Sequence, residues 1–453
     1  MEKKDLKPAG VFKYFEEICQ VPRPSKKEEK MIAYLKAFGA KHNLETKVDE
    51  VGNILIKKPA TPGKENLQTV VLQSHIDMVC EKNNNVQHDF LTDPIETEID
   101  GEWLKAKGTT LGADNGIGVA TELAILADDT IEHGPLECLF TVDEETGLTG
   151  AFALKEGFMS GDILLNLDSE DEGEIFIGCA GGIDSVAEFT YKDIEVPAGY
   201  FFFKVEVKGL KGGHSGGDIH LGRGNANKIL NRFLTRIANK HDLYLCEING
   251  GNLRNAIPRE AYAICAVPED AKHDVRTELN IFASEMEDEL SVVEPDLKLV
   301  LESEAPRKTA IDQGTTDRLL KALYAAPHGV YAMSQDIPGL VETSTNLASV
   351  KMKPNNVIRI ETSQRSSILS ARNDMANTVR TVFLLAGANV TFGEGYPGWK
   401  PNPHSAILEV AAESYKRLFG VDAKVKAIHA GLECGLFLDK YPALDMISFG
   451  PTL

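Results

Sequence analysis

An apolar segment that ends in three consecutive carboxylates dominates this sequence. Residues 138–142 predict a buried strand, and Asp143, Glu144 and Glu145 follow it directly. Acidic side chains at the mouth of a buried strand repel one another and resist removal from water, so folding alone gives no reason to place them there. A bound cation supplies a reason, because one carboxylate can bind it while a neighbour takes a proton from water. The alternative is helix capping, in which Asp143 or Glu144 satisfies free N–H groups.

A second predicted strand has a histidine and an acid at its carboxyl end. The apolar run in residues 69–79 predicts a central strand, and His75 and Asp77 lie where ligand sites form in open α/β sheets. Because side chains at i and i+2 of an extended backbone share a face, Asp77 can orient the imidazole of His75. A lone His-x-Asp pair more often has a structural role, so it indicates a ligand site only together with further candidate ligands.

Two more junctions supply acids. Asp114 lies between glycines just before a predicted helix at 117–128, where capping is the alternative, and the predicted strand at 163–167 ends in Asp168. Helix capping can explain one such junction, but it does not readily explain why four strand or helix ends around one sheet each carry a histidine or an acid. The combined imidazole and carboxylate set suits Zn²⁺ or Mn²⁺. Its members are His75, Asp114, Glu144, Glu145 and Asp168.

Composition limits the partners and the compartment. The net charge is −20, from 48 basic and 68 acidic residues without a long basic run, which argues against nucleic acid and anionic membranes as partners. Seven scattered cysteines without a CxxC pair argue against a disulfide framework. No segment approaches 18 apolar residues, and no apolar signal segment opens the sequence, so we expect a cytoplasmic protein that does not span a membrane.

The periodicity of apolar residues changes twice along the chain. Residues 1–186 alternate helices and strands in the α/β manner, residues 187–396 read as an inserted α+β domain, and α/β texture returns in residues 397–453. The predicted fold class is therefore α/β. A catalytic domain with a mixed, mostly parallel sheet flanked by helices is interrupted by an inserted α+β domain.

At this level of detail the sequence resembles a known family. Four motifs resemble, in order, the metal-site motifs of the M20 metallopeptidases, a group of zinc peptidases; they lie at 74–78, 112–116, 143–147 and 166–168. Further segments narrow the resemblance to the aminoacyl-histidine dipeptidase branch, whose bacterial members cleave carnosine-type Xaa-His dipeptides. These segments are Glu170, 178–182, the Gly-Gly-His-Ser-Gly-Gly loop at 212–217, and 429–433.

The resemblance implies a metal centre with two Zn²⁺ ions per subunit, with Mn²⁺ or Co²⁺ as alternatives. It implies that His75 and Asp168 hold one ion and that Glu145 holds the other. Asp114 would bridge the two ions. Members of the family also carry a last metal-binding histidine shortly after a Gly-Pro-Thr turn like 450–452. This sequence ends at Leu453, so we expect that ligand to lie outside it, with His429 as the alternative.

The resemblance also implies roles in catalysis and substrate binding. Glu144 would be the general base acting on a water between the metals, and Asp77 would steer His75. The inserted domain would act as a lid, in which His214 polarises the scissile carbonyl. Asn255 and Arg365 would hold the carboxylate end of a small peptide. A flexible glycine-rich loop around His214 suits such a lid.

Three functions remain open at this point. The first is a zinc-dependent dipeptidase, which acts on a small peptide and forms a homodimer. The second is a related hydrolase, either a tripeptide aminopeptidase or an N-acyl amino acid deacylase. The third is a non-catalytic metal- or peptide-binding protein on the same scaffold. The presence of Glu144 favours an enzyme, because a binding protein needs no carboxylate base beside its ligands.

Overall fold

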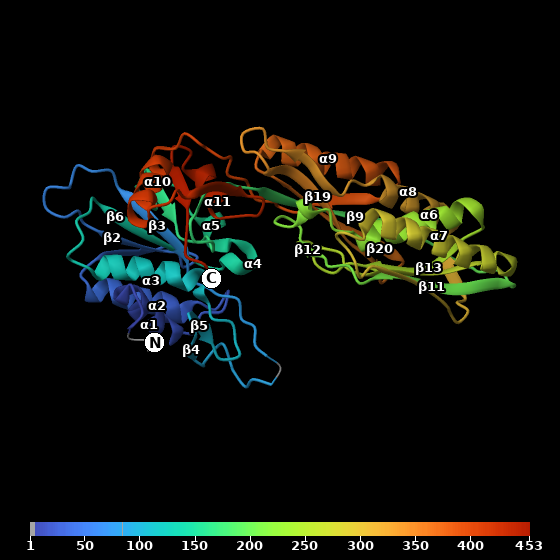
Figure 1. Cartoon of the computed structure of the whole chain (residues 1–453), viewed down its shortest axis with the longest axis horizontal. Helices are drawn as coiled ribbons and strands as arrows, with labels where there is room; N and C mark the ends of the chain where they lie inside the picture. The colour runs from blue at the N-terminus through green and yellow to red at the C-terminus, as the bar shows by residue number, and fades with distance from the viewer. Residues whose placement is uncertain (1–4, 84) are drawn as a thin grey trace. The chain divides into compact units, whose positions relative to one another are not determined.

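The computed structural model describes residues 5–83 and 85–453, and they form two compact units (Figure 1). Unit 1 consists of Met1–Cys179, Trp399–Ala427 and Leu432–Leu453. Unit 2 consists of Ala180–Gly398 and Ile428–Gly431. Each unit has a sheet of its own, so the two are described separately.

Unit 1 is built on an eight-stranded sheet with the order β1-β2-β6-β3-β7-β23-β8-β22. Its strands are β1 (Glu45–Val48), β2 (Ile54–Lys58), β3 (Val70–His75), β6 (Leu136–Thr141), β7 (Ile163–Asn166), β8 (Glu174–Cys179), β22 (Lys424–Ile428) and β23 (Asp445–Ser448). The four central strands run parallel, since β3 pairs parallel with β6 and β7, and β23 with β7. Antiparallel pairing joins β1 to β2, β2 to β6 and β23 to β8. The sheet is therefore mixed and parallel at its centre, as predicted.

Helices cover both faces of this sheet. Figure 1 shows α1 (Ala9–Cys19), α2 (Glu29–Lys41) and α3 (Ala113–Ala127) on one face and α10 (Ala406–Phe419) on the other. Apolar side chains of the first three helices and of β2, β3 and β6 form one core, in which Phe15, Met31, Val119 and Phe140 are fully buried. Burial on both faces explains why the central strands are apolar runs without polar alternation. The remaining elements are the hairpin β4 (Thr97–Asp100) and β5 (Trp103–Ala106), with the short helices α4 (Glu144–Gly147), α5 (Thr149–Ala153) and α11 (Cys434–Lys440).

Unit 2 is an antiparallel sheet covered by helices. The order is β16-β11-β15-β13-β19-β20-β9-β21, and β18 pairs with β19 beside this path. Its strands are β9 (Gly181–Thr190), β11 (Tyr200–Lys208), β13 (Tyr244–Gly250), β15 (Ala261–Pro268), β16 (Lys298–Ser303), β18 (Gly329–Met333), β19 (Val341–Lys353), β20 (Val357–Ser366) and β21 (Asn389–Phe392). Two-stranded pairs join β10 (Asp193–Glu195) to β17 (Thr309–Ile311) and β12 (Gly213–His214) to β14 (Ala256–Ile257).

The helices of unit 2 pack on one face of its sheet (Figure 1). They are α6 (Ala226–Lys240), α7 (Lys272–Leu290), α8 (Gln313–Ala325) and α9 (Leu369–Leu385), with two short 3₁₀ turns at Ile219–Leu221 and Glu269–Ala271. Asn225 caps α6, because its side chain accepts a hydrogen bond from the backbone N–H of Lys228. Apolar positions spaced by three and four residues in α6 bury Ile229, Phe233 and Ile237 against the sheet.

One strand of unit 2 is longer than its sequence predicts. The apolar pattern predicts a strand at 348–352, whereas β19 begins at Val341. The added residues are polar but buried, because the sheet satisfies them. Thr343 bonds to the hydroxyl of Ser366 at 2.9 Å, and Nδ2 of Asn346 donates to the carbonyl of Ala256 at 2.8 Å. None of the helices among the described residues combines the length and the apolar character that crossing a bilayer requires.

Candidate active site

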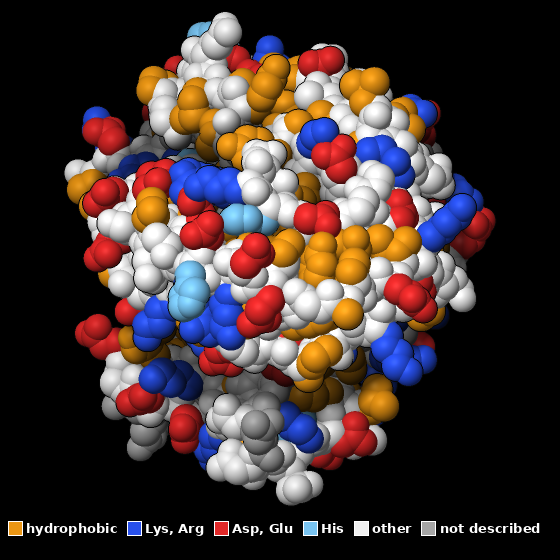
Figure 2. All heavy atoms as spheres, turned by 90° about the vertical axis from the view of Figure 1, so that its right-hand side faces the viewer, with side chains coloured by type: hydrophobic (Ala, Val, Ile, Leu, Met, Phe, Trp, Pro, Cys, Tyr) orange, Lys and Arg blue, Asp and Glu red, His pale blue; other side chains and the backbone are white. Residues whose placement is uncertain are grey.

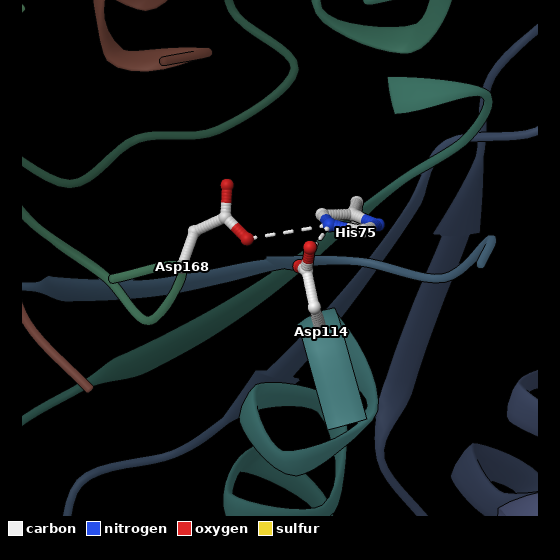
Figure 3. Close-up of side chains that lie close together, drawn as sticks. All are labelled: His75, Asp114 and Asp168. Atoms are coloured by element: carbon white, nitrogen blue, oxygen red, sulfur yellow. Dashed lines mark hydrogen bonds and ion pairs between the residues drawn. The ribbon is translucent and has the colours of Figure 1, made fainter. Parts of the chain in front are cut away.

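Three predicted metal ligands converge at the carboxyl end of the central strands of unit 1 (Figure 3). The Nε2 atom of His75 lies 2.9 Å from Oδ1 of Asp114 and 3.3 Å from Oδ1 of Asp168. One ligand atom from each residue lies within 4.8 Å of the others. His75 ends β3, Asp168 follows β7, and Asp114 lies in the first turn of α3. Because β3 and β7 are parallel neighbours, their ends meet at one edge of the sheet.

A buried arginine and a glycine position the loop that carries Asp114. Arg23 donates hydrogen bonds to the carbonyls of Asp77 at 3.0 Å and Gly112 at 2.6 Å, which tie the end of β3 to the start of α3. Gly112 has a φ of 69°, and a Cβ atom there would lie 2.5 Å from Nη2 of Arg23. This turn therefore requires glycine. Gly112 also occupies the N-cap position of α3, so Asp114 is not the capping residue that the alternative interpretation assumed.

The charges around His75 call for a cation. Burial alone would lower the pKa of His75, but Asp168, Asp114 and Asp77 raise it well above its usual value. The imidazole has only 1% of its side-chain surface exposed. A positive charge among these carboxylates is therefore strongly favoured, and a divalent ion held by nitrogen and oxygen donors can supply it. Such a donor set fits Zn²⁺ or Mn²⁺.

Asp77 links the imidazole to the carboxylates after β6. Its Oδ1 atom lies 3.3 Å from Nδ1 of His75 and accepts a hydrogen bond from the backbone N–H of Glu144 at 3.0 Å. Its Oδ2 atom accepts bonds from the N–H of Glu145 at 3.2 Å and from the hydroxyl of Ser25 at 2.7 Å. The side chain is fully buried. Asp77 thus fixes both the ring of His75 and the start of α4.

Glu144 and Glu145 open α4, whose N-cap position is occupied by Asp143. Asp143 has a φ of 49° and makes no side-chain cap bond, and its carboxylate instead accepts bonds from the hydroxyls of Thr146 and Thr149. Helix capping therefore does not explain this run of acids. Burial, followed by the charges of neighbouring carboxylates, raises the pKa of Glu144 well above its usual value. Burial and the charge of Asp114 raise the pKa of Glu145 to about 7.

Three further residues lie at this site, and the sequence analysis assigned no role to them. Asn115, next to Asp114, donates a hydrogen bond from Nδ2 to Oδ1 of Asp168. Glu170 interacts with Asp114, and burial followed by the charge of Asp114 raises the pKa of Glu170 to about 7. Glu433 is fully buried and acts electrostatically on Glu144. Adjacency to Asp114 could have indicated Asn115, whereas Glu170 and Glu433 appear in the sequence only within segments that carry the family resemblance, with no role attached to either residue.

The predicted substrate-binding residues lie in unit 2. Nδ1 of His214 accepts hydrogen bonds from the backbone N–H groups of Gly217 at 3.0 Å and Gly216 at 3.3 Å. Burial, together with the positive charge of Arg365, lowers the pKa of His214. Asn255 is exposed, and its carbonyl accepts a bond from the N–H of Ser215 at 2.8 Å, next to His214.

Arg365 is buried in β20 with an incomplete set of partners. Its Nη1 atom donates to the hydroxyl of Tyr396 at 2.9 Å, whereas Nε has no acceptor among the described residues. His429, the alternative metal ligand, also lies in unit 2, where Nε2 is 2.7 Å from Oγ of Ser344. Burial and the nearby charge of Arg365 lower the pKa of His429 to about 3.

Comparison with known proteins agrees with the fold and identifies the family. Residues 205–294 match the model of the M20 peptidase dimerisation domain. The whole chain is 47% identical over 452 residues to the cytosol non-specific dipeptidase of Escherichia coli K12, and it covers 93% of that protein.

Solved structures extend the comparison. The aminoacylhistidine dipeptidase of Vibrio alginolyticus is similar over 100% of this chain and 92% of its own, with a TM-score of 0.90 and 46% identity. The aminopeptidase PepT of Bacillus cereus shares the fold at a TM-score of 0.57 and 16% identity, over 97% of this chain and 89% of its own. The chain therefore belongs to the M20 metallopeptidases, in the branch of the aminoacylhistidine dipeptidases.

Proposed function

We propose that this protein is a cytosolic dipeptidase that cleaves small dipeptides, Xaa-His dipeptides of the carnosine type among them. The observation that carries the proposal is the grouping of His75, Asp114 and Asp168 beside Glu144 and Glu145 in a chain of this family. The names of the relatives support the substrate class, since one is a non-specific dipeptidase of the cytosol and the other an aminoacylhistidine dipeptidase.

We assign two Zn²⁺ ions to the site. His75 and Asp168 would hold one ion, Glu145 would hold the other, and Asp114 would contribute to both. The position of Asp114 supports the shared role, because its carboxylate lies against His75 and also interacts with Glu145. When bound, the ions polarise the scissile carbonyl and lower the pKa of the attacking water.

Glu144 is the proton carrier of the reaction. It takes a proton from the attacking water and delivers it to the nitrogen of the leaving amine. A raised pKa suits this exchange, because a carboxyl group that binds a proton more readily than usual is a better acceptor for the proton of water and can pass it on to the amine. Asp77 is the positioning residue that holds His75 and the backbone of Glu144 in place through its two oxygen atoms.

Unit 2 supplies the lid of the proposed enzyme. His214 polarises the carbonyl, while Asn255 and Arg365 bind the carboxylate end of the dipeptide. The free Nε–H of a buried Arg365 supports this assignment, because a buried donor without an acceptor suits an anionic ligand. Because the pKa of His214 is lowered, its imidazole is neutral and can donate one hydrogen bond.

We also infer that the protein forms a homodimer, because residues 205–294 match a peptidase dimerisation domain. On the face drawn in Figure 2, acidic side chains lie between the basic ones, and hydrophobic side chains gather beside them. This face therefore shows no continuous basic stripe of the kind that binds nucleic acids.

A substrate panel tests the proposal. The purified protein, loaded with Zn²⁺, is assayed on β-alanyl-histidine, other dipeptides, tripeptides and N-acetyl amino acids. We expect turnover of the dipeptides, its loss after chelation, and its recovery when Zn²⁺ returns. Activity confined to tripeptides or to N-acetyl amino acids would establish the related aminopeptidase or deacylase instead. A protein that binds Zn²⁺ but cleaves none of these compounds would be a binding protein.

A further inference from the structure

A row of buried polar side chains lies beneath the site, across the central strands of unit 1. Gln73 of β3, Asn166 of β7 and Ser448 of β23 are in register on three neighbouring parallel strands. Nδ2 of Asn166 donates to Oε1 of Gln73 at 2.6 Å, and the hydroxyl of Ser448 donates to Oδ1 of Asn166 at 2.5 Å. All three side chains are fully buried. The row therefore runs through the interior of the sheet.

Glu433 closes this row at one end. Its Oε2 atom accepts hydrogen bonds from Nε2 of Gln73 at 2.6 Å and from the hydroxyl of Thr141 at 2.8 Å. The side chain has no exposed surface, and Oε1 has no donor among the described residues. Glu433 precedes α11, so a segment far along the chain is fastened to the ends of β3 and β6.

Stability of the fold does not explain this arrangement. A buried carboxylate whose partners are neutral loses the solvation of its charge, and apolar residues of similar volume at such positions are often as stable or more so. The row does have a consistent relation to the site. Gln73 precedes His75 by two residues, and Asn166 precedes Asp168 by two. Thr141 likewise stands just before the carboxylates that open α4.

We propose that Glu433 is a positioning residue of the metal centre, a role that rests on the proposed function. Its Oε2 atom joins the side chains of Gln73 and Thr141, and this junction adds to the backbone pairing that already places His75 of β3 opposite Thr141 of β6. His75 continues the first strand, and Glu144 follows the second. Without the junction Nε2 of Gln73 keeps only its bond to the hydroxyl of Thr141 at 3.2 Å, and that hydroxyl keeps only its bond to the carbonyl of Ser74 at 3.4 Å. The backbone ladder still pairs the two strands, but the side chains at their ends are held less tightly. Residues that support metal ligands in this way act on metal affinity as well as on activity.

Two substitutions at Glu433 separate hydrogen bonding from charge. Glu433→Gln removes the charge but keeps a carbonyl oxygen that can accept both bonds, whereas Glu433→Met keeps the volume and removes both. Zn²⁺ is titrated into the metal-free full-length protein, and kcat, KM and the melting temperature are measured. We expect Glu433→Met to weaken Zn²⁺ binding and to lower kcat by about 10–100-fold with little change in KM, and Glu433→Gln to stay within about 3-fold of the wild type.

Glu137→Met is the matched control. Glu137, like Glu433, is a buried carboxylate, and it lies in β6 at the end of the strand opposite Thr141. Its side chain pairs with Lys57 at 2.6 Å and accepts a hydrogen bond from the hydroxyl of Ser160 at 2.6 Å. We expect this variant to lower the melting temperature while Zn²⁺ affinity stays unchanged. Thr141→Val removes one donor at constant shape, and we expect it to weaken Zn²⁺ binding by about 10-fold, the low end of effects at supporting residues.

Specific results would overturn the proposal. If Glu433→Met and Thr141→Val bind Zn²⁺ like the wild type and only melt earlier, Glu433 is structural. If Glu433→Gln loses as much Zn²⁺ affinity as Glu433→Met, the negative charge of Glu433 supports Zn²⁺ binding and its hydrogen bonds do not position the site. Should Glu433→Met fail to fold, Thr141→Val and Glu433→Gln decide the question. Failure of the wild type to cleave dipeptides would remove the proposed function but leave the Zn²⁺ titration informative.

Discussion

At the scale of single residues, two adjacent carboxylates are given different tasks by their surroundings. Burial raises the pKa of Glu144 well above its usual value, and burial with the charge of Asp114 raises that of Glu145 to about 7. We predict that Glu144→Gln keeps both metal ions, because Glu144 is assigned no ion, and lowers kcat by about 10²–10⁴-fold, the range for a lost general base. Metal analysis and steady-state kinetics check this. Glu145→Gln is the control and should lose metal, and near-native turnover of Glu144→Gln would place the base elsewhere.

At the scale of elements, the loop between α1 and α2 supports the site through one side chain. Arg23 is buried and donates to the backbone carbonyls of Asp77 and Gly112. We predict that Arg23→Met lowers the free energy of unfolding by at least about 2 kcal/mol, because hydrogen bonds to a charged group are lost and carbonyls lose their donor. Denaturant unfolding measures this. The exposed Arg417→Met should change stability by less than about 0.5 kcal/mol, and an equal loss in both variants would contradict the prediction.

A second prediction at this scale concerns the strand β18, which follows a partly buried histidine. Burial, followed by the charge of Lys228, lowers the pKa of His328 to about 4 from an ordinary value of 6.5. Above pH 6.5 the ring is neutral in both states, whereas between pH 6.5 and 4 only the unfolded chain takes up a proton. Stability is therefore lost as the pH falls, by up to about 2 kcal/mol from this residue at pH 5.

The pH dependence of unfolding in His328→Gln tests this statement. The variant should lose less stability than the wild type between pH 7 and pH 5, whatever its stability at pH 7. His273→Gln, at an exposed position of α7, should follow the wild-type curve. A slope in His328→Gln equal to that of the wild type would mean that the ring is not held neutral in the folded state.

At the scale of the whole molecule, the proposed enzyme divides its work between two units. The proposed metal ligands belong to unit 1, whereas His214 and Arg365 belong to unit 2. If both units act on one substrate, His214→Ala should leave the metal content unchanged and lower kcat/KM. Arg365→Ala should raise KM for dipeptides with a free carboxylate. Amidated dipeptides are the control, and an equal loss on amidated and free substrates would contradict the assigned role of Arg365.

Much of this molecule can be predicted from local patterns. Apolar runs without polar alternation predicted the strands β3, β6 and β7, and the spacing of Ile229, Phe233 and Ile237 is typical of a helix such as α6. The polar first half of β19 escaped prediction, because its side chains are buried by partners on other strands. A local sequence pattern indicates which face of an element is apolar. It does not indicate which polar residues are buried, because their hydrogen-bond partners lie far away in the sequence.

The sequence by itself determined the fold class and the acids and histidine that parallel strands would deliver to one edge of a sheet, because strand direction and the end of an apolar run are local properties. Only the tertiary structure decided what supports them. Glu433 meets Gln73 across 360 positions and Thr141 across 292, and Arg23 meets Gly112 across 89. Such contacts depend on how helices and strands pack after they form, and no periodicity in the sequence encodes that packing.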